Sequence, residues 1–329
     1  MLAVVAARWP LVRMSWSRAM SMNIFDRSAK LRQRERAAHN PDVALFDYVK
    51  DEIGYRLADR VFDIKRQFRH VVDLGCGRGH VSQHISADNV TKLTMCEFSP
   101  ALLTQAKGPE EGVEVERLAL DDEGPLPFKD VDLVVSSLAL HWVNDLPSTF
   151  ERVFKSLRPD GAFLGCLFGG DTLFELRCSL QLASLERSGG IASHVSPMAH
   201  VRDVGSLLTR AGFVMQTVDT DELKVGYPSM LELMTDLQGM AENNAAHNRL
   251  THLPRDNILA AASIYKEMYG DDKGVPATFQ VIYFLGWKPD PSQPKPLERG
   301  SGEISIKDLY RLDEIVKEIH KKDDDDRTK

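Results

Sequence analysis

Short apolar runs alternate with segments of helical periodicity through the middle of the chain. The apolar runs occupy residues 70–75, 91–98, 113–120, 131–140 and 161–169. Between them, residues 99–107 and 146–157 have apolar side chains at steps of three or four, which is typical of helices. Ser99 and Pro100 supply an N-cap and a first-turn proline for the first of these helices. Strands that alternate with helices predict crossover connections, a parallel sheet and an α/β fold.

The pattern continues on both sides of this central part. Residues 214–227 and 277–289 predict two further strands, and residues from about 228 to 270 predict a helical insert between them. Residues 23–69 predict an N-terminal helical segment, with one apolar stripe along residues 43–61. We therefore expect a main domain over residues 70–290, preceded by helices.

Both ends of the chain differ in composition from this domain. Residues 1–22 contain three arginines, several serines and alanines, and no Lys, Asp or Glu, which is typical of a mitochondrial transit peptide. A disordered start without a targeting role is the alternative. Residues 291–329 predict a Pro-rich linker, a short amphipathic helix and a disordered acidic tail.

The charge, the hydropathy and the cysteine content of the chain argue against several classes of protein. The formal charge of −7 argues against nucleic acid as the main partner, because phosphate binding needs a basic surface. No apolar run approaches the roughly 18 residues of a membrane span. The four cysteines form no CxxC pair and no zinc-ligand spacing, so we expect free thiols in a reducing compartment and no metal site.

The stretch VVDLGCGRGH, at residues 71–80, carries the main chemical signal. Gly75, Gly77 and Gly79 follow the first predicted strand directly. Glycines at such a turn allow positive φ, and they let a ligand approach the backbone N–H groups closely. The dinucleotide fingerprint is G-x-G-x-x-G, and here the third glycine comes one residue too early for it. The spacing therefore fits NAD poorly.

The pattern DLGCGRG resembles motif I of the class I S-adenosylmethionine (SAM)-dependent methyltransferases. Glu97 ends the second predicted strand, where a carboxylate can accept hydrogen bonds from both ribose hydroxyls. The stretches DDEGPLPF (121–128) and LRPDGAFLG also resemble motifs of this family. The resemblance implies a Rossmann-like sheet of order 3-2-1-4-5-7-6, with the last strand antiparallel and SAM over the strand ends.

The same resemblance assigns roles to several residues. Asp73 would help to orient the glycine loop, Asp122 would contact adenine, and Ser136 would lie near the amino-acid part of SAM. The SAM-binding positions implied in this way are Asp73, Gly75, Gly77, Gly79, Glu97, Asp122 and Ser136.

Longer strings resemble a more specific family. They are MNIFDRSAK, SSLALHWVNDLPSTF, GCLFGGDTLFELRCSLQLAS, LMTDLQGMAENNAAHNR and VPATFQVIYFLGWK. Together they are similar to the mitochondrial complex I assembly factors that act as arginine hydroxylases. This resemblance implies hydroxylation of an arginine on a core complex I subunit, cooperation with other assembly factors, and a place in the matrix, peripheral on the inner membrane.

The residues themselves do not display a hydroxylase centre. A non-haem iron site uses two His and a carboxylate, yet none of the ten histidines has Asp or Glu two residues later. His141 follows the fourth predicted strand and is a candidate general base, with ordinary packing as the alternative. Asp171 and Asp221 are candidates to face a guanidinium, with a solvated surface charge as the alternative.

Two other functions stay open at this point. The strings SSLALHW and GGDTLFELRCSL also resemble the methyltransferases that esterify a malonyl group on acyl carrier protein. In that case basic residues of the insert would meet the malonyl carboxylate. The second alternative is an assembly chaperone that keeps SAM as a structural ligand.

Overall fold

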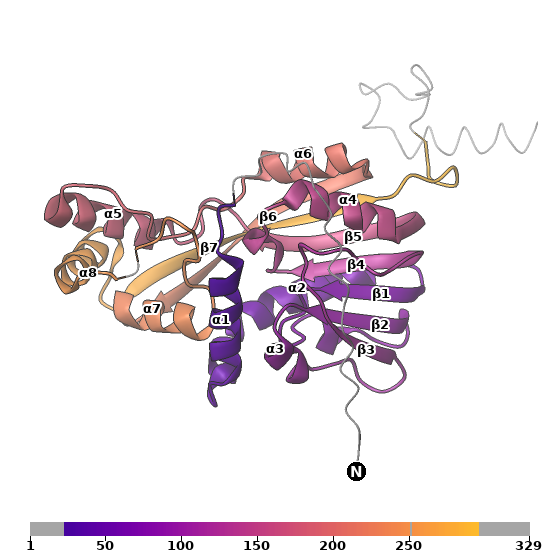
Figure 1. The fold of residues 1–329 in the computed structure, drawn as a ribbon, viewed down its shortest axis with the longest axis horizontal. Helices are drawn as coiled ribbons and strands as arrows, with labels where there is room; N and C mark the ends of the chain where they lie inside the picture. Colours follow the sequence, from indigo (N-terminus) through magenta and orange to yellow (C-terminus); the bar gives the residue numbers. More distant parts are fainter. Residues whose placement is uncertain (1–22, 251, 296–329) are drawn as a thin grey trace, which may run out of the picture. The chain divides into compact units, whose positions relative to one another are not determined.

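The apolar runs of the sequence form one seven-stranded sheet in the computed structural model, which describes residues 23–250 and 252–295. Neighbouring strands follow the order β3-β2-β1-β4-β5-β7-β6 (Figure 1). The strands are β1 (Phe68–Leu74), β2 (Val90–Glu97), β3 (Glu114–Ala119), β4 (Val131–Ser137), β5 (Leu157–Phe168), β6 (Val214–Tyr227) and β7 (Val275–Trp287). Strands β1 to β5 pair in parallel, whereas β7 is antiparallel to both β5 and β6. The order and the reversed strand confirm the sheet expected from the sequence.

Helices pack on both faces of this sheet. The α-helices of the described residues are α1 (Arg27–Ala38), α2 (Tyr48–Asp63), α3 (Pro100–Thr104), α4 (Leu146–Ser156), α5 (Phe174–Ser188), α6 (Val201–Ala211), α7 (Met230–Gly239) and α8 (Arg255–Tyr269). Successive residues of a strand point to opposite faces, so Val71 and Val72 of β1 enter different apolar cores. Helix α2 packs on the face of Val71, and α4 and α6 pack on the face of Val72. Cys76, Cys96 and Cys166 are buried free thiols in these cores.

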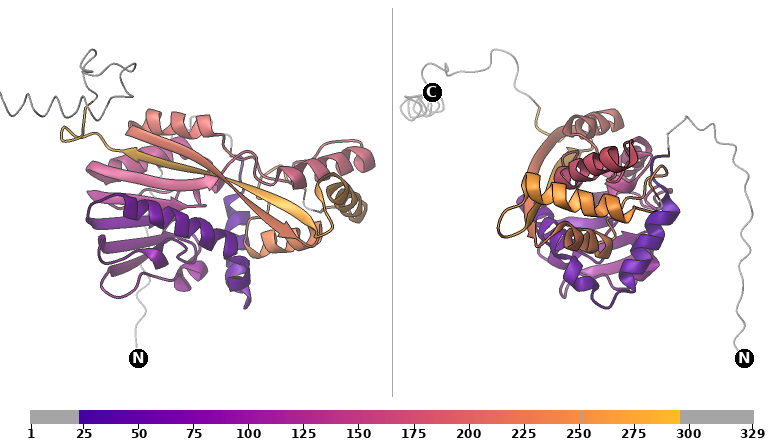
Figure 2. Two further views of the ribbon diagram at one scale, coloured as in Figure 1. Left: turned by 180° about the vertical axis from the view of Figure 1, so that it is seen from behind. Right: turned by 90° about the vertical axis from the view of Figure 1, so that its left-hand side faces the viewer.

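Strands β6 and β7 extend beyond the parallel strands and carry α5, α7 and α8 at their far end (Figure 1). Helix α5 packs against α8, and α7 contacts both α8 and α1. The right-hand view of Figure 2 shows these helices grouped beside α1. Helices α7 and α8 lie within the insert expected at about 228–270. The insert thus faces the ends of the strands, where the glycine loop also lies.

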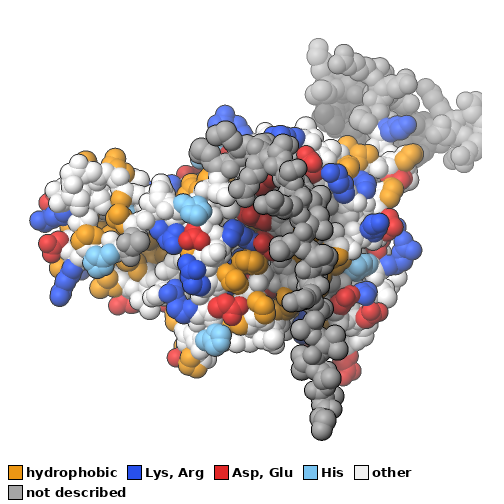
Figure 3. Space-filling model, viewed as in Figure 1, with side chains coloured by type: hydrophobic (Ala, Val, Ile, Leu, Met, Phe, Trp, Pro, Cys, Tyr) orange, Lys and Arg blue, Asp and Glu red, His pale blue; other side chains and the backbone are white. Residues whose placement is uncertain are grey.

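No helix is predicted at residues 174–188, yet α5 forms there. Its signal is present in the sequence, because Leu176, Leu180 and Ala183 recur at helical spacing and are buried. The outer surface of α5 keeps Leu182 and Leu185 exposed. Figure 3 shows hydrophobic side chains interspersed with polar and charged ones over this region.

Some element boundaries differ from the predicted ones. The apolar stripe along residues 43–61 is divided between a short 3₁₀ turn (Val43–Phe46) and α2, which begins at Tyr48. Helix α3 ends at Thr104 instead of 107, although Ser99 caps it and Pro100 occupies its first turn as expected. Strand β5 begins at Leu157, directly after α4, so the proline and glycine that follow lie inside the strand.

The chain divides into units of residues 1–290 and 291–329. None of the helices in the described ranges combines the length and apolar character needed to cross a bilayer. The expected transit peptide (1–22) lies outside the described residues. The expected C-terminal helix and acidic tail also lie outside them, within 296–329.

Helix α2 approaches the glycine loop so closely that Gly54 is expected to be essential for stability. A Cβ at Gly54 would overlap the carbonyl oxygen of His80, whereas a Cβ at Gly205, in α6, meets no atom within 4 Å. We expect Gly54→Ala to destabilise the protein by about 1–3 kcal/mol through overpacking. Gly205→Ala should stabilise it by up to about 1 kcal/mol, because alanine favours a helix. Urea unfolding of both variants checks this, and equal stability of the two would contradict the packing of α2 on the loop.

Candidate functional site

The loop after β1 turns on three glycines with left-handed backbone. Their φ angles are +77° at Gly75, +57° at Gly77 and +85° at Gly79, values that residues with a Cβ rarely adopt. Two of these glycines are also required by packing. A Cβ at Gly75 would overlap the side chain of Ala139, and a Cβ at Gly79 would overlap the carbonyl oxygen of Lys107.

Gly77 is the glycine whose missing side chain leaves space for a ligand. An added Cβ there would lie 3.3 Å from the ring of His80 and meet no backbone atom. Gly75 and Gly77 line a small cavity of about 30 Å³, and Gly79 does not. The loop therefore presents its bare backbone to a ligand mainly at Gly77.

Glu97 closes the other side of this cavity. Its side chain is buried and accepts three hydrogen bonds. Oε2 accepts from the N–H of Gly77 at 3.0 Å, and Oε1 accepts from the N–H of Ser99 at 3.0 Å. The third donor is Nη1 of Arg34, from α1, at 2.8 Å from Oε1. The guanidinium of Arg34 thus binds the carboxylate that the sequence analysis expects to accept hydrogen bonds from the ribose hydroxyls of SAM.

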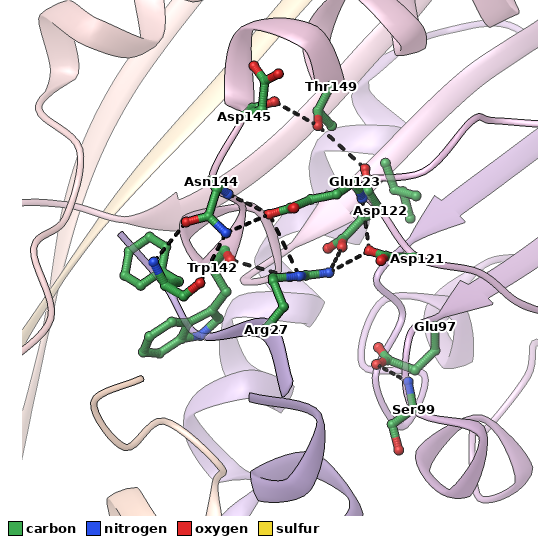
Figure 4. A network of polar contacts seen from close by, with 12 residues as sticks. Arg27, Glu97, Ser99, Asp121, Asp122, Glu123, Trp142, Asn144, Asp145 and Thr149 are labelled. Carbon is green, nitrogen blue, oxygen red and sulfur yellow. Dashed lines mark hydrogen bonds and ion pairs between the residues drawn. The ribbon is translucent and has the colours of Figure 1, made fainter. Parts of the chain in front are cut away.

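A second arginine of α1 pairs with Asp122, the carboxylate that the sequence analysis expects to contact adenine. Arg27 points into a cluster of acidic side chains and pairs with both Asp122 and Asp121 (Figure 4). Asp122 is buried, and burial raises the pKa of its carboxyl to about 6, against the opposing effect of Arg27 and Arg34. Its second oxygen, Oδ2, has no hydrogen-bond partner in the described structure. That oxygen is free to accept a bond from a ligand.

Helix α1 places its functional side chains on one face. Arg27, Lys30 and Arg34 follow at steps of three and four, so they point the same way. Lys30 is completely buried, donates to the carbonyl oxygens of Ala241 (2.8 Å) and Asn243 (3.2 Å), and lies 3.2 Å from the centroid of the Trp142 ring. Helix α1 therefore joins the loop after α7 to the strand ends.

The site fits SAM in its residue types but not in its present volume. The bare backbone at Gly77 and the buried carboxylates of Glu97 and Asp122 match the contacts that a sulfonium nucleoside needs. The cavity of about 30 Å³ is far too small for such a molecule. A nucleoside could therefore bind the carboxylate of Glu97 only after Arg34, which lines this cavity, has released it.

Asp73 and Ser136 support the loop from below. Asp73 accepts a hydrogen bond of 2.6 Å from the hydroxyl of Ser82, and burial raises the pKa of its carboxyl to about 7. Ser136 donates to the carbonyl oxygen of Leu74 at 2.7 Å, which ties β4 to the end of β1. Neither residue lines the cavity. Asp73 lies where it can orient the loop, and the SAM contact predicted for Ser136 stays a prediction.

His141 belongs to a buried cluster around Glu242. Glu242 Oε2 accepts from His141 Nε2 at 3.2 Å and from Trp142 Nε1 at 2.8 Å, while Oε1 pairs with Lys50 at 3.0 Å. Burial is the main cause that lowers the pKa of His141, so the imidazole is neutral near pH 7. Burial opposes ionisation of Glu242, but Lys50 and His141 hold its pKa well below the ordinary range. An ionised carboxylate only accepts, so His141 carries its proton on Nε2.

The structure does not bring Asp171 and Asp221 to this site. Asp171 is exposed and accepts from Nε2 of Gln280 at 2.9 Å. Asp221, on β6, pairs with Arg56 of α2 at 2.5 Å. Neither lines the cavity beside the glycine loop. Both carboxylates are therefore already engaged at the surface.

Sequence reasoning missed several residues that form the site. They are Arg27, Lys30, Arg34, Lys50 and Glu242. The spacing of the three cations in α1 was a usable signal, because it places them on one face of a helix that has no apolar stripe. Glu242 carried no such signal, because it lies in a loop and its burial depends on tertiary contacts.

A separate group of side chains beside the loop has metal-ligand geometry. One ligand atom each from Asp47, Asp51 and His80 lies within 4.8 Å of the others. Arg78 pairs with Asp47, and His80 Nδ1 bonds Asp51 at 2.7 Å, so these groups already satisfy one another. We interpret them as an ion-pair network that fastens α2 to the loop.

The seven-stranded sheet has the fold of the class I SAM-dependent methyltransferases. Residues 72–165 match the family described as methyltransferase domain. A solved structure from Bacillus halodurans, assigned to the methyltransferases, has the same fold with a TM-score of 0.50 and 17% identity, covering 71% of this chain and 99% of that one.

Sequence comparison identifies the particular family. The zebrafish (Danio rerio) protein named "Arginine-hydroxylase NDUFAF5, mitochondrial" is 50% identical over 92% of this chain and 94% of its own length. The human protein of the same name is 50% identical over 90% of this chain and 86% of its own length. The chain belongs to this arginine-hydroxylase family. A malonyl-[acyl-carrier protein] O-methyltransferase from Methylovorus sp. is 28% identical over 81% of this chain and 90% of its own length.

Removing Arg34 should make SAM binding tighter. In Arg34→Ala the carboxylate of Glu97 keeps its two backbone donors and becomes available to the ribose. We expect about tenfold higher affinity by calorimetry, because a charged hydrogen bond worth about 1.5–3 kcal/mol no longer competes. Arg36→Ala, an exposed arginine on the same helix, is the matched control and should leave affinity unchanged. Weaker binding by Arg34→Ala would show instead that Arg34 is a SAM ligand.

The buried Asp73 should make stability depend on pH. Its pKa rises from 3.8 to about 7 on folding, so the cost to stability is complete above pH 7 and decreases progressively as the pH falls from 7 towards 3.8. Asp73→Asn cannot ionise, so its melting temperature relative to the parent protein should be higher at pH 8 than at pH 5. Thermal unfolding at both pH values tests this. The same difference at both would show that Asp73 does not titrate in this range.

Proposed function

We propose that this chain is a SAM-binding arginine hydroxylase of mitochondria that acts in the early assembly of complex I. The observation that carries the proposal is 50% identity to arginine hydroxylases over at least nine tenths of the chain. The glycine loop with its facing carboxylate supports the cofactor, and the mitochondrial names of the relatives support the location.

In this proposal Gly77, Glu97 and Asp122 hold SAM once Arg34 has released Glu97. Bound SAM would supply a sulfonium methyl group, which serves methyl transfer and not the insertion of oxygen, so the oxygen atom of hydroxylation comes from another source. Gly77 offers its bare backbone, Glu97 accepts from the ribose hydroxyls, and Asp122 accepts from the adenine end. Glu242 positions the neutral imidazole of His141 through a hydrogen bond. If His141 acts as a general base, it does so while bonded to this carboxylate. For Asp171 and Asp221 the catalytic assignment stays a prediction.

The proposed substrate is an arginine on a core subunit of complex I, handed over with the help of other assembly factors. The proposed place of action is the matrix, peripheral on the inner membrane. The net negative charge of the chain supports a protein substrate over nucleic acid.

A malonyl-carrier methyltransferase is the second candidate, favoured by the 28% identical relative. That reaction needs a basic residue free to meet the malonyl carboxylate. Arg249 is a basic residue of the insert, but it is not free for this role, because Asp26 pairs with it at 3.1 Å. Lys50, which is also basic, pairs with Glu242 at 3.0 Å. A malonyl carboxylate would therefore have to displace Asp26 or Glu242 to reach either of these cations.

Comparing mitochondrial proteins with and without this chain tests the function. We expect one complex I subunit to gain the mass of one oxygen atom on a single arginine when the chain is present, measured by peptide mass spectrometry. A methyl mass would support the transferase. Loss of complex I without any mass change would support the chaperone.

A further inference from the structure

A second and larger cavity lies between α5, α7 and the loop that follows α7. Its volume is about 300 Å³. Leu176 and Leu180 of α5 and Met234 and Leu237 of α7 form its apolar walls. Its polar lining includes Glu242 and Asn243. The cavity thus combines an apolar passage with polar groups.

Glu242 borders both cavities, because it also lines the small cavity beside Gly75 and Gly77. It is the one residue that the linings of these two cavities share among the described residues. A side chain that reached Glu242 through the larger cavity would therefore end next to the glycine loop. A ligand that fills the larger cavity would therefore place its terminal group beside the proposed SAM site.

The chemistry of the larger cavity matches an arginine side chain. An arginine has an apolar stem that suits the leucine and methionine walls, and a planar cation with five N–H donors at its end. Glu242 supplies a buried carboxylate, and carboxylates bind guanidinium groups in a bidentate manner. Asn243 Oδ1 is a buried acceptor with no partner in the described structure. An unpaired buried acceptor costs free energy, so a donor from a ligand is favoured there.

We propose that this cavity binds the substrate arginine, with Glu242 as the acceptor for its guanidinium and Asn243 as a second acceptor. The inference rests on the proposed hydroxylase function and deepens it, because it assigns the substrate site to the insert. It replaces Asp171 and Asp221 as the carboxylates that face the guanidinium.

The cations already present near Glu242 allow this exchange. Lys50 pairs with Glu242 but also donates to the carbonyl oxygen of Met240 at 2.7 Å, and its side chain is 21% exposed. Lys50 therefore keeps its bond to Met240 and its contact with water when a guanidinium binds the carboxylate of Glu242. Lys30 donates to two carbonyl oxygens of the same loop, and burial lowers the pKa of its amino group well below the ordinary value, against the attraction of Glu242. Arg249, the arginine in the cavity lining, is neutralised by Asp26.

The test measures binding of Nα-acetyl-arginine amide to the full chain by calorimetry or NMR titration. The matching lysine and citrulline compounds serve as probes of shape and charge. We expect binding of the arginine compound and at least tenfold weaker binding of both others, because only arginine offers a charged planar fork. Glu242→Gln should weaken the arginine compound at least tenfold. Glu186→Gln, an exposed carboxylate on α5, is the matched control and should not change it.

A second variant keeps the proposal testable if Glu242→Gln does not fold. Met234→Trp fills the larger cavity without touching the carboxylate, and SAM binding shows whether that variant is folded. We expect it to exclude the arginine compound. Unchanged binding in a folded Met234→Trp or Glu242→Gln variant would overturn the site, as would absence of binding to the parent protein at millimolar concentration.

The site and the proposed function fail in different ways. If Glu242→Gln still hydroxylates the subunit arginine at the parental rate in mitochondria, the function stands and the assigned site is wrong. If the parent protein produces no hydroxyarginine but binds the arginine compound through Glu242, the site stands and the hydroxylase proposal is wrong.

Discussion

The buried ion pair between Arg34 of α1 and Glu97 of β2 is the interaction on which the site depends. Removing both charges from water costs several kcal/mol and is tolerated only with close hydrogen bonds. Glu97 obtains these from the N–H groups of Gly77 and Ser99, which belong to the sheet end itself. The carboxylate therefore needs one more donor, and this donor is interchangeable. A guanidinium supplies it in the closed state, and ribose hydroxyls can supply it when a nucleoside is bound.

Helix α1 connects this carboxylate to the rest of the site. Its three cations reach Asp122, the loop after α7 and Glu97 from one helical face. The proposed cofactor end and the proposed substrate end are therefore bound by the same element. A displacement of α1 that opened the nucleoside site would also loosen the loop that carries Glu242. In the proposed function, cofactor loading and substrate access would therefore be linked through α1.

The sheet was predictable from the sequence because its signals are local. Apolar runs that end in glycine, with Ser99 and Pro100 starting the next helix, specify strand–loop–helix units without tertiary information. The loop glycines and Glu97 were predictable for the same reason. The partners of α1 were not, because they are carboxylates far along the chain; the sequence shows only that its three basic residues share one helical face.

Helix α5 and the surroundings of Asp171 and Asp221 differ in how far the sequence indicates them. The apolar spacing of α5 is local, whereas the contacts of Asp171 and Asp221 depend on tertiary packing. The structure pairs them with Gln280 and Arg56 on the outside of the fold. Glu242 lies at the site because the insert folds back over the strand ends. This long-range packing cannot be predicted from a local sequence pattern.

The stacking of Lys30 on Trp142 gives the protein its own optical reporter. The chain has four tryptophans, and two of them, Trp9 and Trp16, belong to the first 22 residues. A chain without that segment would emit only from Trp142 and Trp287. The indole of Trp142 contacts the amino group of Lys30 and forms a T-shaped pair with Phe25, so its emission depends on the position of the N-terminal helix. Fluorescence can therefore follow opening of the site in real time without an attached dye.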